Sequence, residues 1–260
     1  MVRVRVGDAQ IATRQWGEGP PLLMLHGLGG DGRLWREQVA PLGEHYRMVA
    51  VDLRGFGGSD KPHDPAAYRI PALTRDCAGL ADALGLGPLH VLGTSMGGFI
   101  AQALALSRPE LCRSLVLCHT AARMSIPADI LEARVETLGR LSMREYAQML
   151  AAQALAPGSV ERLEGEIVEV IAGNDQWVYT QVLTEALTAF DLGERVADIA
   201  APTLVLVGES DRVIPPQHGR ELAARIPGAR LVTIRDAGHL SYLEQPAAFN
   251  QAVLDFLATV

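Results

Sequence analysis

The sequence is poor in the residues that mark disulfide-stapled, zinc-binding or nucleic-acid-binding proteins. It contains three cysteines, Cys77, Cys112 and Cys118, an odd number without a CxxC or Cys/His spacing, so neither a disulfide framework nor a metal site is expected. The formal net charge is −7 and no block of Lys and Arg occurs, which argues against a nucleic-acid partner. We expect a neutral or modestly charged small molecule as ligand.

Long apolar runs are also missing. No run approaches the ~20 residues that a helix needs to cross a bilayer. Residues 1–6, Met-Val-Arg-Val-Arg-Val, alternate apolar and basic side chains, which is typical of a strand and not of a signal peptide. The sequence therefore predicts a cytoplasmic protein without a membrane partner, and it leaves the oligomeric state open.

Short apolar runs recur along the 260 residues, separated by longer helical patterns. Such alternation is typical of an α/β protein with a mostly parallel sheet flanked by helices. Several runs lack polar alternation, as strands buried on both faces do. The eight strands expected are residues 1–6, 11–16, 22–25, 48–51, 89–92, 115–118, 204–207 and 231–234.

Residues 121–195 break this alternation, because they show successive helical patterns and no convincing strand. Ser142 and Glu145 have the spacing of a capping box, and Ser159 and Asp175 are further expected N-caps. We therefore expect a core domain made of residues 1–120 and 196–260. Residues 121–195 are expected to form a helical cap inserted after the sixth strand.

The strongest local signal is residues 93–98, Gly-Thr-Ser-Met-Gly-Gly, which connect a predicted strand directly to a helical run. This is a G-x-S-x-G motif in the strand–turn–helix context where the serine acts as a nucleophile. The flanking glycines give room for a sharp, strained turn. We predict Ser95 as the nucleophile. The Met96 N–H, at the start of the helix, is the first predicted oxyanion donor.

A serine hydroxyl needs a base, and the base needs an acid that holds it. Asp211 follows the strand 204–207 and His239 follows the strand 231–234. Because the carboxyl ends of parallel strands meet at one edge of a sheet, the two side chains are expected at the same edge. The order serine, acid, histidine is the one expected after a G-x-S-x-G motif. We predict His239 as the base and Asp211, in preference to Glu209 or Asp236, as the acid.

A second oxyanion donor is expected from the glycine-rich loop at residues 26–30, His-Gly-Leu-Gly-Gly, which follows the strand 22–25. We predict the Leu28 N–H for this role. The loop does not have the G-x-G-x-x-G spacing of a dinucleotide site, so no cofactor is expected. Residues 52–59, rich in glycine and charge, are interpreted as a structural loop beside the site.

Together these segments resemble the α/β-hydrolase superfamily, from the loop at residue 26 to the final helix after residues 244–246. Within it the chain is most similar to the 3-oxoadipate enol-lactonases, through Leu-Val-Leu-Cys-His-Thr-Ala-Ala-Arg at 115–123 and Ala-Gly-His-Leu-Ser at 237–241. The resemblance implies Ser95, Asp211 and His239 as the triad and a lactone as the reactive group of the substrate. Two features depart from it. His119 stands where those lactonases have asparagine, and the cap lacks their Trp-Phe pair.

Other activities share the fold. Haloalkane dehalogenases and epoxide hydrolases are disfavoured, because they carry aspartate where this chain has Ser95. Carboxylesterases of small linear esters, cofactor-free haloperoxidases or perhydrolases, and C–C bond hydrolases are alternatives. A ligand receptor that has lost turnover is the non-enzyme alternative. Beneath an apolar lid we expect His119, Arg123, Met124 and Trp177 to contact the substrate, with Arg123 as the partner of a substrate carboxylate.

Overall fold

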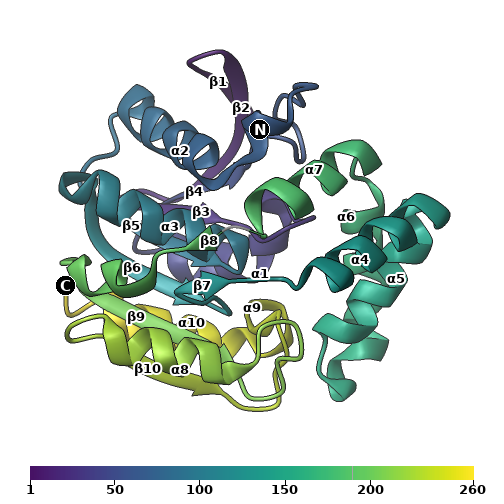
Figure 1. Cartoon of the computed structure of the whole chain (residues 1–260). Coiled ribbons are helices and arrows are strands. Elements are labelled where there is room, and N and C mark those ends of the chain that lie inside the picture. Colours follow the sequence, from purple (N-terminus) through teal and green to yellow (C-terminus); the bar gives the residue numbers. More distant parts are fainter. Residues whose placement is uncertain (189) are drawn as a thin grey trace.

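All eight predicted strands pair in one sheet of order β1-β2-β4-β3-β5-β6-β9-β10 (Figure 1). The computed structural model describes residues 1–188 and 190–260. β1 and β4 each pair with β2 in antiparallel fashion, and the other pairs are parallel, so the mostly parallel sheet is confirmed. The strands are β1 Val2–Val6, β2 Ala9–Trp16, β3 Pro21–Leu25, β4 Arg47–Asp52, β5 Leu89–Thr94, β6 Cys112–Cys118, β9 Thr203–Gly208 and β10 Arg230–Ile234.

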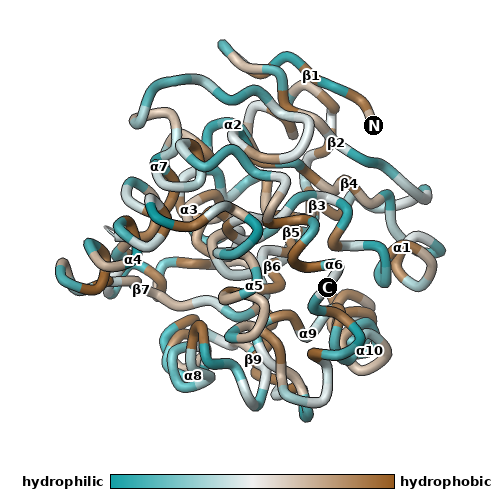
Figure 2. Tube along the Cα trace, turned by 90° about the vertical axis from the view of Figure 1, so that its right-hand side faces the viewer, coloured by the Kyte–Doolittle hydropathy of each residue, from teal (hydrophilic) through white to brown (hydrophobic). Residues whose placement is uncertain are grey.

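Helices cover both faces of this sheet. Successive residues of a strand point to opposite faces, so they pack into two separate parts of the core. In β3, Leu23 and Leu25 pack on the side of α2, α3 and α8, whereas Leu22 and Met24 pack on the side of α1, α9 and α10. Figure 2 shows the central strands β3, β5 and β6 mostly in hydrophobic colours. These helices are α1 Arg36–Gly43, α2 Ile70–Leu84, α3 Met96–Ser107, α8 Pro216–Arg225, α9 Ser241–Glu244 and α10 Pro246–Leu257.

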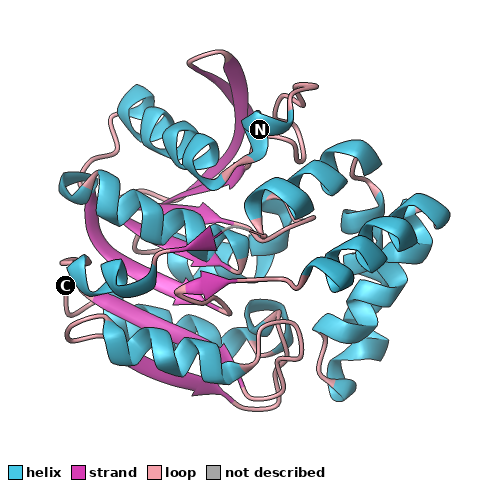
Figure 3. Ribbon diagram, viewed as in Figure 1, coloured by secondary structure: helices cyan, strands magenta, loops and turns pink. Residues whose placement is uncertain are grey.

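Between β6 and β9 the chain forms a group of helices beside the sheet (Figure 3). They are α4 Ala128–Arg140, α5 Met143–Ala154, α6 Val160–Ala172 and α7 Gln176–Ala186. None of the helices in residues 1–188 and 190–260 has the length and apolar character of a membrane span. We propose that residues 121–195 form a cap on the remaining core.

The expectation that residues 121–195 hold no strand is wrong at both ends of the segment. β7, Arg123–Met124, pairs in antiparallel fashion with β8, Phe190–Asp191. Each strand has only two residues, too few to show an alternating pattern in the sequence. The pairing joins the places where the chain leaves and re-enters the core.

The predicted helix starts are confirmed at all three positions, and two of the three residues also make the expected capping hydrogen bond. Ser142 and Glu145 form the reciprocal capping box of α5, and the Asp175 side chain accepts the Val178 N–H at the start of α7. Ser159 stands at the N-cap position of α6, but its side chain makes no capping hydrogen bond. Its backbone is already helical, because Pro157 begins a short 3₁₀ helix, Pro157–Ser159, that runs directly into α6. The other 3₁₀ helices are Gly32–Trp35, Pro65–Tyr68, Pro109–Leu111 and Gly193–Asp198.

Candidate active site

Ser95 occupies a tight turn between β5 and α3. Its φ of 54° and ψ of −119° lie outside the regions that L-residues favour. Glycine is required beside it: a Cβ on Gly97 would lie 2.2 Å from the Leu25 carbonyl oxygen, and one on Gly93 would lie 2.3 Å from that of Gly97. The Ser95 N–H donates to the Cys118 carbonyl at 2.9 Å, which ties the turn to β6. The turn leaves the serine half-buried at the wall of a cavity.

The cavity has a volume of about 500 Å³ and lies between the sheet edge and the helices α4 to α7. Ser95, His239 and Leu28 line it from the core, and mostly apolar side chains, such as Leu150 and Leu183, line it from the helices. A concave apolar site of this size with a few polar groups is typical of small-molecule binding.

Asp211 and His239 come together at the carboxyl ends of β9 and β10. The His239 Nδ1–H donates to Asp211 Oδ2 at 2.8 Å, and His119 Nδ1 lies 3.1 Å from the same oxygen. The backbone N–H groups of Val213 and Ile214 both donate to Oδ1 at 2.9 Å. Burial alone would raise the pKa of Asp211, but the two neighbouring histidines outweigh it and hold that pKa well below its ordinary value. Because an ionised carboxylate fixes the proton on His239 Nδ1, Nε2 is left as the basic nitrogen.

The two rival acids do not contact His239. Glu209 and Asp236 are both exposed, and the Glu209 carboxylate accepts the Asp236 N–H at 3.4 Å. The geometry therefore brings Asp211, the predicted acid, to the predicted base.

The two predicted oxyanion donors border Ser95. A Cβ on Gly27 would lie 3.0 Å from the Ser95 Cβ, so the loop that carries Leu28 passes directly over the serine. Met96 is the first residue of α3. Among the described residues, neither the Leu28 N–H nor the Met96 N–H donates a hydrogen bond to a protein acceptor. Both groups are thus available to a charged oxygen of a bound substrate.

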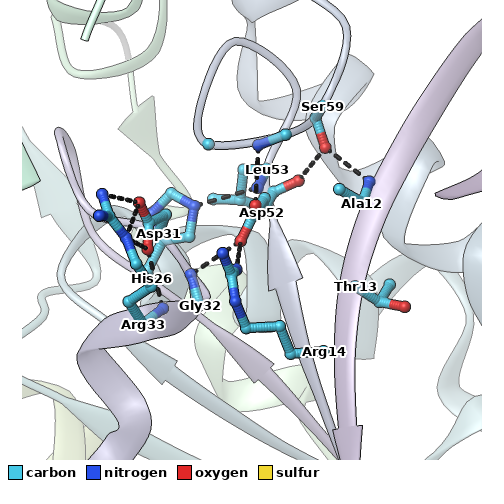
Figure 4. A network of polar contacts seen from close by, with 12 residues as sticks. Ala12, Thr13, Arg14, His26, Asp31, Gly32, Arg33, Asp52, Leu53 and Ser59 are labelled. Atoms are coloured by element: carbon cyan, nitrogen blue, oxygen red, sulfur yellow. Dashed lines mark hydrogen bonds and ion pairs between the residues drawn. The ribbon is translucent and has the colours of Figure 1, made fainter. Parts of the chain in front are cut away.

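Buried polar groups hold the Leu28 loop in place (Figure 4). His26 Nδ1 bonds the Gly27 carbonyl at 2.7 Å, and the Leu53 N–H donates to His26 Nε2 at 3.0 Å. Burial lowers the pKa of His26, so the ring is neutral and can both donate and accept. The fully buried Asp52 accepts the Gly32 N–H at 2.9 Å. These contacts agree with the interpretation of residues 52–59 as a structural loop.

Of the four predicted substrate contacts, Met124 lines the cavity and the other three do not. His119 is 1% exposed and lies behind Asp211. Arg123 is exposed, 3.8 Å from Asp191, because the pairing of β7 with β8 directs it away from the cavity. Trp177 stacks on His63, with ring centroids 3.8 Å apart, and also packs edge-on against Tyr68.

Several polar side chains of the cavity wall, among them Arg134 and Tyr146, are not among the predicted site residues. Arg134, on α4, is exposed at the wall and makes no ion pair with the described residues. Tyr146 and Tyr179 are 4% and 2% exposed, with ring centroids 5.7 Å apart, and burial raises the pKa of both phenols. Their helical spacing in the sequence was visible, but which face of each helix covers the cavity depends on tertiary packing.

Three side chains of the described residues lie close enough together to be considered as metal ligands. Ligand atoms of His119, Asp211 and His239 all lie within 4.8 Å of one another. Both imidazole Nδ1 atoms face the carboxylate, and an Nδ1 that carries the bonding proton cannot coordinate a metal. The contacts fit two imidazole Nδ1–H groups that donate to one ionised carboxylate, so we interpret the cluster as a hydrogen-bond network.

Comparisons with known proteins agree with the fold. A family model described as the alpha/beta hydrolase fold matches residues 20–246. A putative non-heme bromoperoxidase, BpoC of Mycobacterium tuberculosis, is 33% identical over 94% of this chain and 96% of its own length. 3-Oxoadipate enol-lactonase 2 of Acinetobacter baylyi is 32% identical over 93% and 90%. The crystal structure of the enol-lactonase from Burkholderia xenovorans, 33% identical, superimposes with a TM-score of 0.93 over 99% of this chain and 100% of that one.

Proposed function

This chain belongs to the α/β-hydrolase family and is a hydrolase that acts on ester bonds, and we propose that it cleaves a small lactone or carboxylic ester through an acyl-enzyme on Ser95. One observation carries the proposal. A strained serine and a histidine bonded to a buried aspartate line the same cavity. A serine nucleophile needs a general base that a third group orients, and the bond between His239 and Asp211 supplies that arrangement.

The proposed reaction has two halves. Ser95 Oγ attacks the ester carbonyl while His239 Nε2 accepts the serine proton, and the Leu28 and Met96 N–H groups stabilise the oxyanion. Asp211 orients the ring and stabilises the imidazolium. The imidazolium then protonates the leaving oxygen, which leaves an acyl-enzyme. Water, deprotonated by His239, attacks the acyl-enzyme and releases the acid with Ser95 restored.

The cavity supports a compact substrate. The segment between β6 and β9 supplies most of its wall, and the cavity volume of about 500 Å³ suits a small ring. In a lactone the acyl and leaving groups are joined, so the whole substrate stays on Ser95 until water attacks. The enol-lactonase relatives, at 32% and 33% identity, support the same substrate class.

A second candidate is a perhydrolase activity, supported by the bromoperoxidase relative at 33% identity. The same acyl-enzyme would react with hydrogen peroxide in place of water. The peroxide oxygen bonds the acyl carbon, the bond to Ser95 breaks, and a peracid leaves. Linear-ester and C–C bond hydrolysis would use the same serine and the same cavity.

The test is kcat/KM for small lactones against linear esters of equal carbon number. We expect the lactones to be preferred, and we expect Ser95→Ala to lose activity by on the order of 10⁴-fold or more. Ser107→Ala, at the exposed far end of the same helix, is the matched control and should keep full activity. If linear esters are preferred by tenfold, the lactonase proposal fails and the esterase takes its place. Peracid formation exceeding hydrolysis in added peroxide would favour the perhydrolase.

A further inference from the structure

Asp211 holds a second histidine besides the proposed base. Its Oδ2 contacts Nδ1 of His239 at 2.8 Å and Nδ1 of His119 at 3.1 Å. His119 Nε2 in turn lies 2.7 Å from the Ser241 hydroxyl, at the start of α9. His119, Asp211 and Ser241 are all buried, and none of these three lines the cavity. The hydrolysis mechanism given above does not use His119.

The partners fix which nitrogen of His119 carries the proton. An ionised carboxylate has no proton to donate, so the Nδ1–H of His119 must be the donor to Asp211. Nε2 is then unprotonated and accepts the hydroxyl proton of Ser241. Burial lowers the pKa of His119 despite the nearby Asp211, which keeps the ring neutral. The charged or titratable groups that face it are Asp211, His239 and Glu244.

The backbone around His119 links the acid to the nucleophile. Residue 119 has a φ of 50°, a conformation that a bulky side chain adopts only where its surroundings hold it. On one side of it, the Cys118 carbonyl accepts the Ser95 N–H at 2.9 Å. On the other, the Thr120 hydroxyl donates to the Ser95 carbonyl at 3.0 Å. The turn after β6 therefore contacts the serine turn through Cys118 and Thr120, and it contacts Asp211 through the His119 side chain.

We propose that His119 is a positioning residue that holds the Asp211 carboxylate in the orientation that His239 requires. With Oδ1 held by two backbone N–H groups and Oδ2 by two rings, the carboxylate cannot rotate away from the base. The hydrogen bond from the His119 N–H also partly neutralises the negative charge of Asp211, so that this charge stabilises protonated His239 less. This inference rests on the hydrolase mechanism proposed above.

The test compares His119→Ala, which removes the donor, with His119→Asn, which keeps an N–H donor and tolerates positive φ. In His119→Ala we expect kcat to fall about 10- to 100-fold, since small misplacements of catalytic groups have effects of this order, with KM within about twofold. The acid limb of its pH–rate profile should move to higher pH, because Asp211 then stabilises protonated His239 more strongly. His119→Asn should recover most of the loss.

Asp236→Ala is the matched control for backbone strain. Asp236 also has positive φ, 53°, but it is exposed and does not contact Asp211. We expect it to leave kcat and the pH profile unchanged. If His119→Ala behaves like Asp236→Ala, the positioning role is refuted while the serine mechanism stands.

A second readout does not depend on turnover. NMR titration of the His239 ring in an inactive Ser95→Ala background should show the ring keeping its proton to higher pH when His119→Ala is added. An unchanged titration refutes the inference. Absence of Ser95-dependent hydrolysis in an otherwise native protein, with this titration shift present, would refute the proposed function alone.

Discussion

Replacing Ser95 by glycine should stabilise the protein, whereas replacing it by alanine should not. At φ 54° and ψ −119° any side chain with a Cβ is strained, and glycine alone adopts this region readily. Ser95→Ala keeps the Cβ and hence the strain. Ser95→Gly removes the Cβ and with it the strain. The two inactive variants therefore differ in backbone strain while sharing the loss of the hydroxyl.

The size of the difference follows from two opposing terms. Strain of this kind costs roughly 1–3 kcal/mol in the folded state. Against this gain, glycine lowers the free energy of unfolding by about 0.5–1 kcal/mol, because it loses more conformational freedom on folding than other residues do. A net gain of about 1 kcal/mol is expected. For a chain of 260 residues, about 1 kcal/mol corresponds to a rise in Tm of about 2 °C.

Calorimetry or thermal circular dichroism of the two variants, at one pH and scan rate, measures this difference. Ala105→Gly, in the interior of α3 where the backbone is helical, is the control for glycine itself and should lower Tm. A Tm for Ser95→Gly at or below that of Ser95→Ala would refute the idea that the nucleophile is held in a strained turn.

Three further outcomes are expected. Asp211→Asn should lower kcat by on the order of 10⁴-fold with an unchanged circular dichroism spectrum, and Glu209→Gln should not; the reverse would move the acid to Glu209. Burial lowers the pKa of His90 from 6.5 to about 4. The stabilisation that neutral His90 contributes, at most about 3 kcal/mol, is therefore complete above pH ~6.5 and is lost as pH falls through ~4. Between pH 7 and 4 the Tm of His90→Gln should fall less than that of the wild type, and an equal fall in both proteins would contradict this prediction. If Arg134 binds a substrate carboxylate, Arg134→Gln should lower kcat/KM about threefold for a half-ester with a free carboxylate but not for its neutral methyl ester, since exposed ion pairs contribute at most about 1 kcal/mol. An equal loss in Arg123→Gln, outside the cavity, would contradict this role of Arg134.

The fold was predictable because burial on both faces leaves a strong mark in the sequence. Runs such as Leu22–Leu25 and Leu204–Val207 are apolar at successive positions, since odd and even residues pack against different helices. The two strands that were missed, β7 and β8, have two residues each and no periodicity. Ser159 directly precedes α6 as predicted, but it makes no capping hydrogen bond, and its backbone is already helical in the 3₁₀ turn that begins at Pro157.

The candidate site was predictable where function depends on a motif or on a strand end. Ser95, Asp211 and His239 follow strands of one parallel sheet, so their side chains must meet at its carboxyl edge. His119 also follows a strand, but its positive φ sets the direction of its side chain, and sequence spacing does not reveal that angle. Trp177 lies on a helix whose cavity-facing side is decided by tertiary packing alone.

Hydrogen bonds also join the cavity helices to the triad loops, at the carboxyl end of α5. The His239 N–H donates to the Ala154 carbonyl at 2.7 Å, and Arg212, next to the acid, donates to the Leu155 carbonyl at 3.0 Å. The buried Glu244 carboxylate accepts backbone N–H groups on both sides of His239 at 2.9 and 3.0 Å, and the Ala156 N–H at 2.7 Å. The loops of the base and the acid are thus fixed to the same helix end that helps to enclose the cavity. A rearrangement of α5 would therefore displace the base and alter the shape of the cavity together.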